Sequence, residues 1–438
     1  MFRTIFVLIL VAIGGYYAVQ APFYALLFYI GNAYFRPEDW VWTNFVSSLK
    51  LSLLSGMLVV TTTFLSGQRF VWNSRIALVW LLLLHTFLST LGAEHFSYSW
   101  GYWTDFLKTI IITYMIVVLV DDFSKFRLLL LVMVFALGLE QARQGWIYLI
   151  TSPSWHNENL VALLGDNNGV AVGMLMLVPI IGFLKQTSDG KWSKHLYWFL
   201  LIGCLYRALS TYSRGGFLAA VAMGVIWWLR TQYKFRGLLA IAVLIAVVSV
   251  AAPDAYWTRV HTIQTYGEEQ DESVLARFHF WKVALEMANR NPLEGVGYQG
   301  YNVSYNQYDF SYGAHGVERS VHSSFLGVLA ELGYVGALMF VMVIVSALRS
   351  CSRVRKLAVK EAAFSTLGKG AIALQTSLVA FLVGGSFVSF QYNEMLWHII
   401  GLTIALERLA SRRQAEIMSG NLSESAMNCA SDKGWAAA

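Results

Sequence analysis

Apolar runs long enough to cross a lipid bilayer recur along almost the whole chain. A run of about 18 or more apolar residues is a candidate membrane-spanning helix, because in lipid each span must satisfy its own backbone hydrogen bonds. With 57% hydrophobic and 13% charged residues, the chain has about half the charged fraction of a soluble domain. We therefore predict an all-α, polytopic integral membrane protein with about 12 transmembrane helices, or 12–13. The apolar segments lie near 4–18, 21–35, 46–66, 76–92, 104–120, 126–150, 166–184, 195–210, 214–229, 237–252, 323–348, 368–390 and 395–407.

Lysine and arginine gather in the connections that the positive-inside rule assigns to the cytoplasm. Counting back from the basic connection 349–369, segment 253–322 lies on the outer side, 185–194 lies inside, and 151–165, which has no Lys or Arg, lies outside. This alternation agrees at each step and fixes the predicted orientation. The basic residues of 349–369 are Arg349, Arg353, Arg355, Lys356, Lys360 and Lys369.

The first 35 residues leave the number of spans open. Two short spans would put Met1 outside and give the higher count, whereas one long span broken at Pro22 would put Arg3 inside and give the lower count, which Arg3 favours. The first apolar run is predicted to be a retained span, because no small-residue signal-peptide cleavage site follows it.

Segment 253–322 is the only long polar interval between apolar runs, and together with the polar stretch after 410 it divides the chain into four units. These are an N-terminal transmembrane bundle over 1–252, a loop on the outer side over 253–322, C-terminal transmembrane helices over 323–410 and a disordered cytoplasmic tail over 411–438.

Within this loop, the pattern predicts a surface helix over 274–290 that Ser273 caps and that lies along the membrane. The glycines of 295–297 predict a turn, and the Tyr- and Asn-rich segment 298–312 suits contact with sugars. The predicted apolar face of the helix comprises Val274, Phe278, Trp281, Leu285 and Ala288.

Arg214 stands at an outer turn between two spans, directly before Gly215 and Gly216. One interpretation is an anion site, because a guanidinium and the N–H groups of a helix N-terminus bind phosphate, and glycines let a ligand approach. The other is an ordinary arginine that reaches the interface. Arg277 in the outer loop could equally contact headgroups, but two outer arginines together fit a diphosphate.

His322 stands just before a long apolar run and can accept a proton near neutral pH in its neutral form. A single interfacial histidine is more often structural, but His315 and Arg319 lie close in sequence and support a site. Tyr212 and Asn168 are further candidate substrate contacts. For Asn168 and its neighbours Asp166 and Asn167, a helix cap is the simpler interpretation.

The sequence contains no pattern typical of a metal, cofactor or nucleic-acid site. The acidic run 268–272 has no defined ligand spacing, and the three cysteines lie far apart, so we predict no metal site and no cofactor. The net charge of +6 reflects the basic connections and requires no nucleic acid. Glu140, Gln141 and Arg143 lie together within a span and are predicted to pair between helices.

Three short motifs follow one another on the predicted outer side. They are Ser213-Arg214-Gly215-Gly216-Phe217-Leu218, then Arg277…Trp281…Ala284 leading to Asn291-Pro292…Gly295-Val296-Gly297, then His322-Ser323-Ser324-Phe325-Leu326…Glu331-Leu332-Gly333-Tyr334-Val335-Gly336. In order, spacing and side, the stretch from about 160 to 345 resembles the O-antigen ligase/polymerase superfamily of bacterial envelope glycosyltransferases.

The resemblance implies a GT-C-like enzyme of the bacterial inner membrane whose site faces the periplasm. Its donor would be an undecaprenyl-diphosphate-linked glycan, its acceptor a lipid A–core sugar hydroxyl, and membrane lipids would surround it. The family pattern carries phosphate-binding arginines onto Arg214 and Arg277, and an essential loop histidine onto His322. Ser323 stands where the family has Asn, and Asp166, Asn167 and Asn168 match an Asn-rich family element loosely.

We predict an O-antigen ligase, and two kinds of alternative stay open. A polymerase of O-antigen or exopolysaccharide, or a protein O-glycosylation ligase, would differ only in the acceptor. A polysaccharide transporter or flippase would need polar groups along a central path, whereas this chain concentrates them in one outer loop. An ATP-driven pump is not supported, because the chain has no P-loop.

Overall fold

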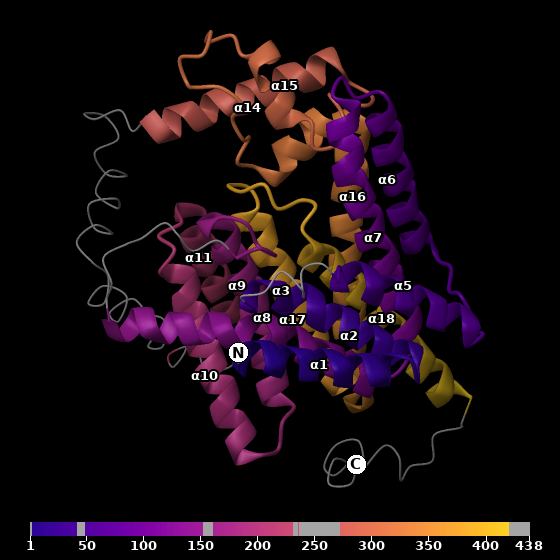
Figure 1. Cartoon of the computed structure of the whole chain (residues 1–438). Coiled ribbons are helices and arrows are strands. Elements are labelled where there is room, and N and C mark those ends of the chain that lie inside the picture. Colours follow the sequence, from indigo (N-terminus) through magenta and orange to yellow (C-terminus); the bar gives the residue numbers. More distant parts are fainter. Residues whose placement is uncertain (1, 42–48, 152–160, 231–234, 236–271, 420–438) are drawn as a thin grey trace.

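The computed structural model describes residues 2–41, 49–151, 161–230, 235 and 272–419 (Figure 1). Within these ranges the regular elements are helices, and the β-pairing is the isolated bridge between Val161 and Gly165. The predicted span 237–252, most of the acidic run and most of the predicted tail lie outside the described residues.

Each predicted apolar segment other than 237–252 coincides with a described helix, because each is a largely apolar run that ends near Gly, Pro or polar residues. The helices are α1 (Phe2–Ala18), α2 (Pro22–Phe35), α3 (Pro37–Trp40), α5 (Leu51–Leu65), α6 (Ser74–Leu91), α7 (Phe96–Leu119), α8 (Phe123–Thr151), α9 (Asn167–Gln186), α10 (Lys191–Leu209), α11 (Arg214–Arg230), α14 (Glu272–Arg290), α15 (Tyr301–Tyr308), α16 (Ser324–Lys360), the 3-10 turn η1 (Ala362–Phe364), α17 (Ser365–Gly384) and α18 (Glu394–Met418).

Five of the described helical segments are long and apolar enough to cross a membrane, which is consistent with the predicted membrane protein of the all-α class. Three further apolar helices are shorter: Arg3–Ala18, Leu51–Leu65 and Arg214–Leu229. The full count of about 12 spans stays a prediction. The five segments are Ser74–Leu91, Phe96–Leu119, Asn167–Gln186, Ser324–Lys360 and Ala362–Gly384.

The first two helices fold back on each other. A Cβ atom on Gly14 of α1 would lie 2.4 Å from the ring of Phe28 in α2, and the Arg3 guanidinium lies 6.0 Å from the Trp40 ring centroid. The alternative of one long span broken at Pro22 is therefore wrong, because the chain reverses before Pro22. This reversal brings Arg3 to the end of the hairpin where Trp40 lies.

Helices α14 and α15 form a separate lobe at one end of the bundle, at the top of Figure 1. The predicted helix over 274–290 is present as α14, but the predicted apolar face is only partly correct. Phe278 and Leu285 are 47% and 41% exposed, whereas Phe280 and Met287 are buried. This lobe has its own core, in which these two residues pack with Val283, Ala284, Val296, Tyr301, Tyr305, Tyr308, Val321 and Ala330.

The tyrosines predicted to contact sugars belong largely to that core and to its junction with the bundle. Tyr298, Tyr301, Tyr305 and Tyr308 are each no more than 6% exposed. Three of them are buried together because Tyr301, Tyr305 and Tyr308 recur at helical spacing along α15 and so share one face of the helix. Tyr312 is the exposed tyrosine of the segment, at 97%.

A break in α16 joins the lobe to the bundle. Gly333 has φ 66° and ψ −173° inside the helix, and a Cβ there would lie 2.6 Å from the Pro292 carbonyl oxygen. The Tyr334 N–H donates to that oxygen at 2.9 Å, and the Val296 N–H donates to the Ala330 oxygen at 3.0 Å. The predicted turn at 295–297 is thereby confirmed as the connection that packs against α16.

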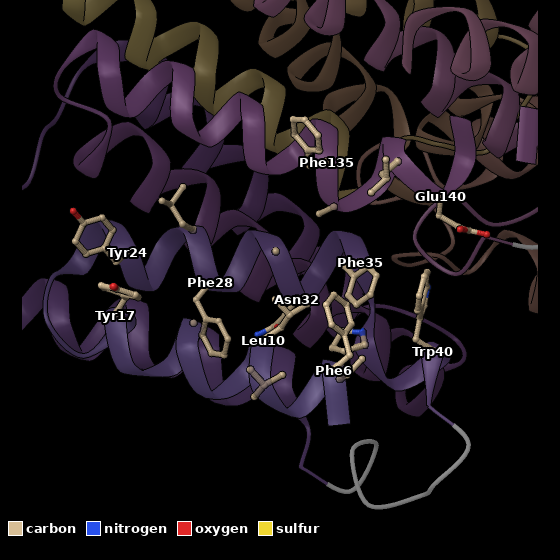
Figure 2. Close-up of a pocket in the computed structure, with 18 residues that line it drawn as sticks. Phe6, Leu10, Tyr17, Tyr24, Phe28, Asn32, Phe35, Trp40, Phe135 and Glu140 are labelled. Carbon is tan, nitrogen blue, oxygen red and sulfur yellow. The ribbon is translucent and has the colours of Figure 1, made fainter. Parts of the chain in front are cut away.

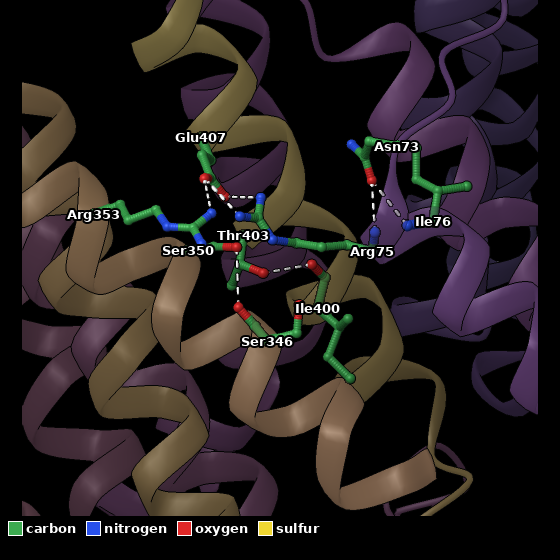
Figure 3. A network of polar contacts seen from close by, with 9 residues as sticks. All are labelled: Asn73, Arg75, Ile76, Ser346, Ser350, Arg353, Ile400, Thr403 and Glu407. Carbon is green, nitrogen blue, oxygen red and sulfur yellow. Dashed lines mark hydrogen bonds and ion pairs between the residues drawn. The ribbon is translucent and has the colours of Figure 1, made fainter.

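At the opposite end of the bundle, a carboxylate ties three helices together (Figure 3). Glu407 of α18 binds Arg75 of α6, whose Nη2 lies 2.7 Å from Glu407 Oε1, and Arg353 of α16, whose Nη1 lies 3.0 Å from the same oxygen. Arg353 comes from the connection 349–369, which the charge pattern assigns to the cytoplasmic side.

Candidate functional site

His322 lies on a short strap between the lobe and the start of α16. Its backbone is left-handed, with φ 49°, a conformation that costs a non-glycine residue energy and is kept only where the surroundings enforce it. The Trp281 indole N–H of α14 donates to the Val321 carbonyl at 3.1 Å. On the other side Ser323 caps α16, since its Oγ accepts from the Leu326 N–H at 3.4 Å.

The start of α16 is clamped to the turn over 385–390, between α17 and α18. The Ser324 N–H donates to the Gly385 carbonyl at 2.7 Å. The Ser324 hydroxyl donates to the Val388 carbonyl at 2.7 Å and accepts from the Phe390 N–H at 2.9 Å. These bonds fix His322 at the bundle end from which this turn emerges.

Arg214 begins α11 and borders the same turn. A Cβ on Gly215 would lie 2.7 Å from the Phe387 Cβ, and a Cβ on Gly216 would lie 2.6 Å from the Ala171 Cβ of α9. The two glycines therefore permit close helix packing, whereas the sequence suggested an approach for a ligand. Gly215, next to Arg214, packs against Phe387 of the 385–390 turn, and Ser324, two residues after His322, is hydrogen-bonded to the same turn. Arg214 and His322 are therefore both close in sequence to residues that contact this turn.

Asp166 caps the N-terminus of α9, which agrees with the simpler interpretation of segment 166–168. The Asp166 side chain accepts from the Gly169 N–H at 2.9 Å, and the Asn168 amide donates to Asp166 at 3.2 Å. The Asn167 amide donates to the Thr211 carbonyl at 3.2 Å and so joins this cap to the turn before Arg214. Asn168 thus helps to hold the cap beside the site.

Charges from three segments act on His322. Burial lowers the pKa of His322, the positive charges of Arg277 and Arg319 lower it further, and the negative charge of Asp166 raises it. The net effect is a pKa below the ordinary value, so the ring is neutral at neutral pH. A neutral imidazole can accept a proton, and nearby guanidinium groups can bind phosphate oxygens.

The remaining candidates lie around this centre. The Arg319 Nε donates to the His315 carbonyl at 2.8 Å, and the Arg319 side chain is exposed. The His315 ring lies 4.6 Å from the ring of His279. Tyr212 is half-buried in the turn before Arg214, with φ 53°.

Two parts of this arrangement were missed by sequence reasoning. One is the 385–390 turn, whose only signal is a pair of glycines at the end of an apolar run. The other is His279, which binds Asp309 at 2.6 Å. His279 is two positions from Arg277, but nothing in the sequence connects it to a residue 30 positions away.

A cavity of about 780 Å³ lies elsewhere, between α1, α2 and α8. Figure 2 shows Tyr17 and Tyr24 at one end of it and Trp40 and Glu140 at the other. Glu140 pairs with Arg143 at 2.5 Å within α8 rather than between helices, which corrects that prediction. Gln141 does bridge helices, because its Oε1 accepts from Arg207 Nε of α10 at 3.1 Å. Among the described residues, no group of three or more His, Cys, Asp and Glu side chains could hold a metal ion.

Comparison with known proteins divides the chain into two matched parts. Residues 199–341 match the family model described as O-Antigen ligase, and this part holds Arg214, Arg277, His315, Arg319 and His322. Residues 1–188 match a model described as a family of unknown function (DUF5935). No curated protein matches the chain.

Proposed function

Because residues 199–341 place the chain in the O-antigen ligase superfamily, we propose that it transfers a glycan from undecaprenyl diphosphate to a sugar hydroxyl of lipid A–core. The reaction takes place at the periplasmic face of the inner membrane. The observation that carries this proposal is the position of His322 within reach of the charges of Arg277, Arg319 and Asp166. All but Asp166 lie inside the matched part.

His322 is the proposed general base. The acceptor hydroxyl oxygen attacks the anomeric carbon of the first donor sugar, the bond from that carbon to the diphosphate oxygen breaks, and the hydroxyl proton passes to the neutral ring. The lowered pKa of His322 supports this role, because the ring remains unprotonated at neutral pH. A single displacement gives a product of inverted configuration at the anomeric carbon.

Arg214 and Arg277 are the proposed diphosphate ligands. Negative charge grows on the leaving diphosphate as the anomeric bond breaks, and preorganised cations stabilise that charge more than the charge of the ground state. Arg214 also opens α11, but the Gly216 N–H of its first turn already donates to Ser213 Oγ at 3.1 Å, so the proposed binding rests on the guanidinium group. Arg214 precedes Gly215, which packs against Phe387 of the 385–390 turn, and Arg277 lies one helical turn before Trp281, which binds the strap at Val321.

Complementation in a Gram-negative host that lacks its own ligase tests the proposal. Wild-type protein should restore a capped lipopolysaccharide ladder, and His322→Ala should leave long glycan on the lipid carrier. If wild type restores nothing there but extends single repeats in a host without its polymerase, the acceptor is another glycan and the ligase assignment is wrong. If neither host responds to a well-expressed protein, the glycosyltransferase assignment itself fails.

A further inference from the structure

A buried histidine–carboxylate pair lies inside the α14–α15 lobe. His279 Nε2 and Asp309 Oδ1 are 2.6 Å apart, and the two side chains are only 8% and 4% exposed. Burying two such groups is costly unless each is well bonded. The pair therefore needs the further bonds that surround it.

Asp309 receives donors from its own loop as well as from His279. The Ser311 N–H and hydroxyl donate to Oδ1 at 2.8 and 2.7 Å, and the Gly313 N–H donates to Oδ2 at 2.8 Å. Although burial opposes ionisation, these donors together with His279 lower the pKa of Asp309 to about 2. The carboxylate is thus ionised and holds the turn over 309–313 in one shape.

The pair connects two of the three segments that bring charge to His322, those of Arg277 and Arg319. His279 lies on α14, two residues after Arg277, whereas Asp309 begins the loop that carries His315 and Arg319 and ends at His322. The His279 ring also contacts rings of this loop, with centroids 4.5 Å from Phe310 and 4.6 Å from His315. The His315 carbonyl in turn accepts from Arg319 Nε at 2.8 Å.

We infer that His279 and Asp309 are positioning residues that fix Arg277 on α14 relative to Arg319 and His322 on the loop. The inference rests on the proposed function, in which Arg277 binds the donor diphosphate. Losing the pair leaves α14 packed on α16, with Phe280, Ala284 and Met287 still in the core of the lobe, but it frees the loop to shift along α14. The consequence is a poorer site for the donor in a protein that is still folded.

The first test is kinetic, with purified protein and a lipid-linked glycan donor. His279→Ala and Asp309→Asn should raise the donor KM and lower kcat/KM by at least about ten-fold, the effect of about 1.4 kcal/mol. His279→Gln, which keeps an N–H donor for Asp309, should recover most of the loss. Glu286→Ala is the matched control, because it removes an exposed pair with Arg290 from the same helix.

The second test does not depend on activity. Spin labels at Leu285→Cys on α14 and Val317→Cys on the loop, both at exposed positions, report the distance between the two segments. We expect a narrow distance distribution in wild type and in Glu286→Ala, and a broad one in His279→Ala and Asp309→Asn.

The outcomes separate the two proposals. Wild type without transfer activity, but with the expected spin-label result, overturns the proposed function and keeps the positioning role. Unchanged kinetics and an unchanged narrow distribution in Asp309→Asn overturn the positioning role. If His279→Ala fails to fold, Asp309→Asn decides, because the amide preserves the side-chain volume.

Discussion

The two ends of the bundle use arginine in opposite ways. At the end shown in Figure 3, Arg75 and Arg353 converge on Glu407, whose side chain is 14% exposed, and its negative charge offsets part of their two positive charges. At the other end, Arg277 and Arg319 act on His322 and lower its pKa. Opposite charges that pair across helices hold a structure together, whereas like charges gathered around a titratable group tune that group. Substitutions at the two ends should therefore affect different properties.

The largest effect on transfer is expected at His322. His322→Ala removes the proposed base and should lower the transfer rate by about 10²–10⁴-fold, the usual contribution of a general base. A single-turnover assay on purified protein measures this, with thermal unfolding as the check on folding. His195→Ala, an exposed histidine of α10, is the control. Full activity in His322→Ala would remove the histidine from the mechanism.

Arg214→Ala and Arg277→Ala come next. Each should lower kcat/KM for the donor by about 10²–10³-fold, as loss of one preorganised charge donor does, and each should leave the protein folded. Steady-state kinetics against donor concentration provides the measurement. A loss of expression or thermal stability with an unchanged donor KM would mean that the arginine is structural, like those that bind Glu407.

Glu407→Ala should show the reverse pattern. It leaves Arg75 and Arg353 without their shared carboxylate in a partly buried position, which should cost about 1–3 kcal/mol of stability. Transfer kinetics at permissive temperature should stay at the wild-type level. Thermal or denaturant unfolding in detergent measures the loss, and Glu416→Ala, on the exposed last turns of α18, is the control. Strong loss of transfer without loss of stability would break the contrast between the two ends.

The smallest effect is a shift in pH dependence. Transfer needs neutral His322, so the rate falls as the pH drops through its pKa, which lies below the ordinary value of about 6.5. Asp166→Asn removes the charge that raises this pKa and should move the acid limb of the pH–rate profile to lower pH. Arg319→Gln removes a charge that lowers it and should move the limb to higher pH. Shifts in the same direction would refute this electrostatic account.

The sequence predicts the helices well, because an apolar run in a membrane protein has few alternatives to a helix. It also places Arg277 and His322 in one polar interval, and in the structure the charge of Arg277 acts on His322. The sequence does not distinguish two backbone paths that the same residues allow. At Pro22 it is compatible both with a kinked single span and with a reversal of the chain between two helices. Composition also misled at 298–312, where the helical spacing of Tyr301, Tyr305 and Tyr308 is a better guide than their affinity for sugars. The His279–Asp309 contact depends on tertiary packing and has no local signal.

Accessibility of the two ends in a cysteine-free background tests the central claim most directly. Tyr312→Cys in the lobe and Val359→Cys near the end of α16 are both at highly exposed positions, 97% and 88%. A membrane-impermeant maleimide added to intact spheroplasts should label Tyr312→Cys at once. It should label Val359→Cys only after the spheroplasts are lysed. Labelling of Val359→Cys alone would put the His322 site on the cytoplasmic side, away from a donor waiting outside, and would contradict the proposed reaction.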